Sequence, residues 1–171
     1  MNNNNILPTD YQSFIALSRY AKWLDKEGRR ETFSETVDRY MENVVSPKIY
    51  DGQENTQGVL ERLELAILDL EVMPSMRSLM TAGAAANRDN TCMYNCSYLP
   101  VDDPKSFDEA MFILLCGTGV GFSVERQFIS KLPDVPDQLF VSETTIVVKD
   151  SKEGWAKAYR QLLSLLWAGE I

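Results

Sequence analysis

Residues 91–125, "TCMYNCSYLPVDDPKSFDEAMFILLCGTGVGFSVE", decide the fold class of this chain. Two short runs in this segment, 95–101 and 119–125, are rich in the β-branched and aromatic residues that strands favour. Between them, the pair Asp103-Pro104 is typical of a helix N-terminus, and Gly117 suits the position just after a helix. The segment therefore predicts a strand, a helix and a strand, which is the order found in α/β proteins.

Outside this segment the apolar residues recur mostly at helical spacing. This periodicity predicts three helices before the segment and one after it, at 10–25, 32–45, 57–70 and 152–168. A further strand is predicted at 142–149, and the small residues of 74–90 predict a loop. The predicted organisation has three parts: a disordered lead at 1–9, a helical region at 10–73, and an α/β region at 74–171.

The composition restricts the classes of function. The chain has 171 residues and a formal net charge of −8, which argues against a general nucleic-acid or anionic-membrane surface. It contains no apolar run near the ~20 residues of a membrane helix, and its first residues lack the pattern of a signal peptide. Three cysteines do not make a secreted disulfide framework, so the sequence predicts a cytoplasmic protein.

All three cysteines fall in the quoted segment, and the chain has no histidine. A structural zinc site needs four Cys or His ligands, and a Cys/His nucleophile pair needs a histidine, so we expect no metal site here. Free cysteine is usually a small buried residue, which fits Cys116 at the end of "MFILLC". Cys92 fits either role. Cys96 stands between polar neighbours, as an accessible redox thiol would, although the residues alone leave burial open for it too.

The glycines at 117, 119 and 121 match neither a Walker A loop nor a dinucleotide fingerprint. The structural alternative is a helix-to-strand turn that requires a left-handed residue. The functional alternative is a place where the backbone approaches a ligand closely. Three glycines exceed the needs of one turn, so we expect both.

Three blocks of the sequence resemble the N-terminal part of the catalytic chain of ribonucleotide reductases. They are "RYAKWLDKEGRRETFSETVDRYMENV", "MPSMRSLMTAG" and "NCSYLPVDDPKSFDEAMFILLCGTGVGFSVER", and they occur in the expected order. The resemblance runs from about residue 10 to the end and is greatest to the monomeric, adenosylcobalamin-dependent ribonucleoside-triphosphate reductases. It implies that the chain is an N-terminal fragment that is inactive alone. In this fragment, the helical region at 10–73 precedes residues 74–171, which would form the first strands of a ten-stranded α/β barrel.

The resemblance also implies roles for individual residues. Cys96 matches the first thiol of the redox dithiol that reduces the ribose, while the thiyl-radical cysteine and the second dithiol cysteine would follow residue 171. Ser78, Asn95 and Gly119 match substrate-binding positions. The effector-site positions are matched by Asp103 and Arg126, although Phe128 stands where relatives often carry a basic residue.

The implied cofactor is adenosylcobalamin, bound mainly by the missing C-terminal part. The implied partners are a ribonucleoside triphosphate substrate, a dNTP effector, a thioredoxin-type reductant and the complementary C-terminal part, with no membrane and no nucleic acid. The alternative hypothesis is a non-catalytic remnant, an interaction protein that keeps the reductase scaffold without its chemistry.

Overall fold

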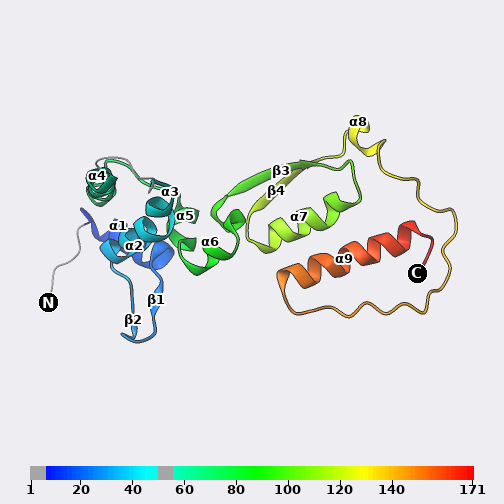
Figure 1. Ribbon diagram of the computed structural model, residues 1–171, viewed down its shortest axis with the longest axis horizontal. Coiled ribbons are helices and arrows are strands. Elements are labelled where there is room, and N and C mark those ends of the chain that lie inside the picture. Colours follow the sequence, from blue (N-terminus) through cyan, green and yellow to red (C-terminus); the bar gives the residue numbers. More distant parts are fainter. Residues whose placement is uncertain (1–6, 50–55) are drawn as a thin grey trace. The chain divides into compact units, whose positions relative to one another are not determined.

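The computed structural model describes residues 7–49 and 56–171, which form two compact units, Met1–Met93 and Tyr94–Ile171 (Figure 1). The unit division follows Met93, whereas the sequence suggested a boundary after residue 73. Most of the predicted lead at 1–9 lies outside the described residues. No helix in the described ranges has the length and apolar character required to cross a bilayer.

The first unit opens with a helix that is shorter than predicted. Helix α1 (Asp10–Ile15) continues as the π-helical turn η1 (Ala16–Tyr20), and Ala21 is already extended. The prediction of a helix to residue 25 was wrong, because β1 (Trp23–Leu24) pairs antiparallel with β2 (Arg29–Arg30). Gly28 closes this hairpin with a φ of +62°, a value that glycine adopts without steric cost.

The second helical segment is longer than predicted. Helix α2 (Phe33–Tyr40) begins with a capping box in which Thr32 and Glu35 satisfy each other's backbone N–H groups. It continues through η2 (Met41–Val45) into α3 (Ser46–Ile49), so the predicted stop before Pro47 was wrong. The π-helical turn changes the backbone hydrogen bonds from i→i−4 to i→i−5 just before Pro47, which has no N–H to donate.

Helix α4 (Thr56–Leu68) confirms the third predicted helix. Past its end, Leu70 has a φ of +60°, and Glu71 N–H bonds to Ala66 O at 2.9 Å, which is the Schellman form of helix termination. The core of the unit lies where α4 faces α2 and the first helix, and its buried members are Ala16, Phe33, Val37, Met41 and Ile67.

The predicted loop at 74–90 is largely helical. It contains α5 (Met76–Thr81) and α6 (Ala84–Arg88), and the 3₁₀ turn η3 (Asn90–Met93) follows. The side chain of Ser75 caps α5 by accepting from Ser78 N–H, and three alanines favour α6. These helices are one or two turns long, which is too short to show an apolar period.

Arg39 of α2 forms hydrogen bonds to the C-terminal end of α5. Its guanidinium donates to Glu31 Oε1 at 2.8 Å and to the carbonyl oxygens of Leu79 and Ala82 at 2.8 and 3.0 Å. Burial alone would raise the pKa of the Glu31 carboxyl, but hydrogen bonds from Arg39 and from Lys22 N–H outweigh it and lower that pKa. The first unit therefore has a charged, hydrogen-bonded centre beside its apolar core.

The second unit confirms the strand, helix and strand of the quoted segment. Strands β3 (Cys96–Pro100) and β4 (Gly119–Ser123) pair in parallel, with helix α7 (Lys105–Leu115) as the crossover packed on them (Figure 1). The N-cap of α7 is Pro104, one residue after the predicted Asp103, and Asp103 Oδ1 accepts from Lys105 N–H at 2.8 Å. Gly117, with a φ of +84°, ends α7 as predicted.

The end of the chain differs in one element. After the short helix α8 (Arg126–Ile129), residues 142–149 form no strand, so that prediction was wrong; the nearby pairing is a single bridge between Phe140 and Glu170. Val141 and Val147 are almost fully exposed, and β propensity alone cannot order a segment without a neighbouring strand. Helix α9 (Lys152–Trp167) confirms the last predicted helix and packs along α7 (Figure 1).

Candidate active site on the β3–β4 pair

Cys96 begins β3, and the register places it directly opposite Gly119 of β4. Gly119 N–H donates to Asn95 O at 2.9 Å, so the backbone fixes these three residues together. Side chains alternate along a strand, and here Cys96 is exposed whereas Ser97 is half-buried. The thiol therefore lies on the open face of the strand pair, and α7 packs against the other face.

The two other cysteines have different surroundings. Cys92 belongs to the first unit, is buried, and donates its S–H to Asp89 O at 3.3 Å. Cys116 is buried at the end of α7, where Lys152 Nζ donates to its sulfur at 3.1 Å. Of the three thiols, Cys96 is thus the one that a solute can reach.

The glycine cluster separates into a turn and a flat surface. Gly117 has the positive φ that the helix-to-strand turn requires, and Thr118 anchors this turn by donating from its buried hydroxyl to Tyr94 O at 2.9 Å. Gly119 and Gly121 are not among the positive-φ residues. A Cβ at either would meet its nearest atom at an ordinary distance, 3.5 Å from Asn95 O and 3.7 Å from Ser97 O respectively. Sequence reasoning missed Thr118, although a threonine between two glycines is a visible signal.

Ser78 lies in the first unit, in the first turn of α5. Its N–H donates to Ser75 Oγ at 3.1 Å, and the two hydroxyls are 2.9 Å apart. This serine thus takes part in the cap of α5, while Asn95, Cys96 and Gly119 belong to the second unit.

The predicted effector residues follow the carboxyl ends of the two strands. Asp103 comes three residues after Pro100, Arg126 comes three residues after Ser123, and these strand ends are register partners. Lys131 Nζ contacts Asp102 Oδ2 at 3.1 Å and so connects the two segments that leave this edge. The carboxyl edge of a parallel sheet is where α/β proteins bind ligands. Asp103 and Arg126 are both exposed there, although the Asp103 carboxylate already accepts a hydrogen bond from Lys105 N–H.

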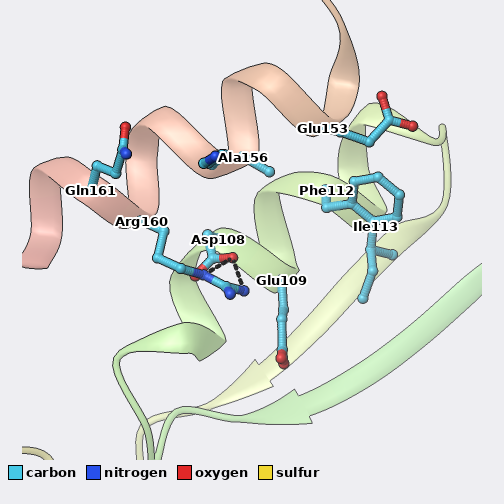
Figure 2. Close-up of a pocket in the computed structure, with 9 residues that line it drawn as sticks. Asp108, Glu109, Phe112, Ile113, Glu153, Ala156, Arg160 and Gln161 are labelled. Atoms are coloured by element: carbon cyan, nitrogen blue, oxygen red, sulfur yellow. Dashed lines mark hydrogen bonds and ion pairs between the residues drawn. The ribbon is translucent and has the colours of Figure 1, made fainter. Parts of the chain in front are cut away.

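A second feature, which sequence reasoning also missed, is a groove of about 590 Å³ between α7 and α9 (Figure 2). In it, Arg160 Nε donates to Asp108 Oδ2 at 2.9 Å, and the hydrogen bond to this carboxylate raises the pKa of Arg160. Asp108 is 3% exposed, and its Oδ1 has no hydrogen-bond partner among the described residues. No cluster of metal-ligating side chains occurs within 7–49 and 56–171.

The strand pair with its crossover helix belongs to a known class of fold. The chain superposes on a crystal structure of B12-dependent (class II) ribonucleotide reductase with a TM-score of 0.73 and 22% identity, over 91% of this chain and 30% of that one. The chain thus has part of the fold of that enzyme class. No protein-family model matches the chain.

Curated relatives carry a more specific name. The adenosylcobalamin-dependent ribonucleoside-triphosphate reductase of Lactobacillus delbrueckii subsp. bulgaricus is 28% identical over an alignment of 165 residues, 80% of this chain and 22% of that protein. The protein of the same name from Lacticaseibacillus paracasei is 29% identical and covers 82% of this chain and 22% of its own length. These similarities confirm the resemblance found in the sequence. The chain spans about a fifth of the length of these relatives.

Proposed function

We propose that this chain is the N-terminal part of a ribonucleotide reductase that converts ribonucleoside triphosphates to deoxyribonucleotides, with Cys96 as one thiol of its redox dithiol. The observation that carries the proposal is the contrast among the three thiols, since Cys96 is exposed and Cys92 and Cys116 are buried. The names of the curated relatives support the reaction class. The barrel of ten strands is part of the same proposal.

The proposed chemistry balances in electrons and atoms. The C2′–O bond of the ribose breaks and a C2′–H bond forms, while Cys96 and a second thiol supply two electrons and two protons. The oxygen leaves as water, and the two sulfurs join in a disulfide. A thiyl radical on a third cysteine removes the C3′ hydrogen at the start and returns it at the end. The second and third cysteines would lie in the complementary part, because Cys92 and Cys116 are buried.

A strand is a suitable support for such a thiol. Main-chain hydrogen bonds hold Cys96 at a fixed position relative to Gly119, and a fixed position keeps a reacting group at a constant distance from its substrate. Gly119 leaves the backbone of β4 open to the substrate, and Asn95 adjoins the thiol. Asn95 and Gly119 are therefore the substrate-binding residues proposed in the second unit, and Ser78 is proposed as a substrate-binding residue of the first unit on the resemblance alone.

The described residues do not fit the cofactor named for the relatives. Their orphaned buried atom, Asp108 Oδ1, lies between α7 and α9 and not on the face that presents Cys96. We therefore assign adenosylcobalamin, which supplies the radical in this proposal, to the complementary part, and derive no step through it. The dNTP effector, for which Asp103 and Arg126 are the candidates, and a thioredoxin-type reductant complete the proposed partners.

The proposal is tested by combining the chain with a polypeptide that supplies the rest of a relative's length. With adenosylcobalamin and a dithiol reductant present, the mixture should form deoxynucleotide, and Cys96→Ser should abolish repeated turnover. Cys116→Ala serves as the matched control and should cost only packing. If both variants turn over like the wild type, Cys96 is not the redox thiol. If no mixture is active although the pieces associate, the chain is a non-catalytic remnant.

A further inference from the structure

On the open face of the β3–β4 pair, β4 carries no side chain at positions 119 and 121, although the fold would allow one at each. Gly119 and Gly121 do not have the positive φ that favours glycine, and a Cβ at either would make only ordinary contacts. Glycine in a strand weakens it, so two on one face are unfavourable for folding alone. Their common result is a strip of bare backbone on β4 that faces Cys96 and Tyr98 of β3.

Tyr98 is the aromatic neighbour of this strip. It is two residues from Cys96, on the same face, and its register partner is Gly121. A Cβ on Gly121 would lie 4.0 Å from Tyr98 Cδ2, so the ring borders the space that the glycine leaves free. The side chain is 64% exposed, and successive residues on one face of a strand are about 7 Å apart. The exposed ring of Tyr98 therefore lies beside the exposed Cys96 thiol, at the next position on the same face of β3.

We propose that Tyr98 is a substrate-binding residue whose ring stacks on the base of the nucleotide while Cys96 faces its ribose, an inference that rests on the proposed function. A flat aromatic face beside a flat backbone strip admits a planar group and excludes a bulky one. Stacking uses the π-face that every base has, so this surface accepts purines and pyrimidines alike. Gly121 is needed because a side chain there would occupy the place of the base.

The test measures binding by equilibrium dialysis, with ATP and with ribose 5-triphosphate, which has the phosphates and sugar but no base. The protein is the chain combined with its complementary polypeptide. Tyr98→Leu should weaken ATP binding by about tenfold, in the range measured for loss of one base-stacking residue, and leave ribose 5-triphosphate within twofold. Tyr98→Phe keeps the ring and should bind both probes like the wild type.

Two further variants separate binding from folding. Phe122 is as exposed as Tyr98, but it follows Gly121 in β4 and so lies on the opposite face of the strand pair. Phe122→Leu should therefore leave ATP binding unchanged. Gly121→Val suits a strand and should preserve the melting temperature, yet it should weaken ATP binding as Tyr98→Leu does. Unchanged ATP binding in Tyr98→Leu, or equal loss of both probes, would overturn the assignment to the base.

The redox role of Cys96 and the base-binding role of Tyr98 can be disproved independently of each other. Cys96→Ser should bind ATP like the wild type while losing turnover, which tests the redox role without Tyr98. If Cys96→Ser turns over normally and Tyr98→Leu still loses ATP selectively, the dithiol proposal is wrong and the base-binding site stands.

Discussion

At the scale of single residues, Gly117, Gly119 and Gly154 are glycine for three different reasons. Gly117 has a positive φ, and Gly119 has room for a Cβ but lies on the face of Cys96. Position 154 has no room for a side chain, since a Cβ there would lie 2.2 Å from Lys149 O. The sequence alone could indicate a turn in "CGTGVGF", but it could not separate these causes, because each depends on the neighbouring backbone.

This difference gives a paired prediction for Gly119 and Gly154. Gly119→Val should raise the KM for the ribonucleotide at least tenfold or abolish binding, because the side chain fills the space of close approach. Gly154→Ala should instead lower stability by ~1–3 kcal/mol, as overpacking does, although alanine normally favours a helix. Thermal melting and steady-state kinetics on the reconstituted protein measure the two effects. A Gly119→Val protein that binds normally and only melts earlier would make this glycine purely structural.

At the scale of elements, prediction succeeded where the ends of an element are marked by residues with one strong preference. Asp103-Pro104 and Gly117 delimit α7, and the strands on either side follow. It failed at 10–25, because Ala21 and Leu24 continue a helical period although the chain turns into a hairpin. That turn depends on pairing with Arg29–Arg30, which no local pattern shows. The strand expected at 142–149 failed for the converse reason, since its β-branched residues have no neighbouring strand in the described structure.

The β1–β2 hairpin is tied to α2 by a carboxylate whose effect depends on pH. Arg29 donates to both oxygens of Glu35 at 2.7 Å, and this hydrogen bonding, together with Thr32 N–H, lowers the pKa of Glu35 to about 2. A lowered folded-state pKa stabilises the protein above the unfolded value of 4.5, and the stabilisation is lost as the pH falls toward 2. Arg29 and Glu35 are 42% and 36% exposed, so solvent screening makes the effect small.

Glu35→Gln should therefore lower the melting temperature at pH 6, and the difference from the wild type should disappear near pH 2. Glu27→Gln is the matched control, because Glu27 also pairs with Arg29 but does not cap the helix. It should shift the melting temperature less at every pH. A difference between Glu35→Gln and wild type that stays constant from pH 6 to pH 2 would show that the charge of Glu35 is not the cause.

At the scale of the whole molecule, the chain presents much apolar surface. Exposed large apolar side chains occur in both units, among them Phe14, Trp23, Tyr98, Phe122, Val141 and Trp155. In the described structure, β3 and β4 pair with no third strand, so each has an open edge. Parallel sheets normally have both faces covered and their edges paired or protected, so we expect this strand pair to associate with other polypeptide. The ten-stranded barrel stays a prediction, because the chain spans about a fifth of its relatives.

The chain alone should therefore be inactive and should associate or aggregate, while the complementary polypeptide should convert it to a soluble complex. Size-exclusion chromatography of each piece and of the mixture measures this, and a deoxynucleotide assay of the complex follows. A monodisperse 171-residue monomer that does not bind the complementary polypeptide would contradict the fragment hypothesis and favour the hypothesis of a non-catalytic remnant.

The parallel register of β3 and β4 also determines which kinds of genetic change this protein tolerates. Cys96 faces outward because five consecutive residue pairs hold the strands in one alignment. Because side chains alternate, inserting or deleting one residue within β3 after Cys96 would move the following residues to the opposite face, and realignment would turn the thiol toward α7. Substitutions change what surrounds the sulfur, but single-residue insertions and deletions change the side of the sheet on which it lies. We therefore expect natural variation between Cys96 and Pro100 to substitute residues, with an aromatic ring kept at Tyr98, while the number of residues in this stretch stays the same.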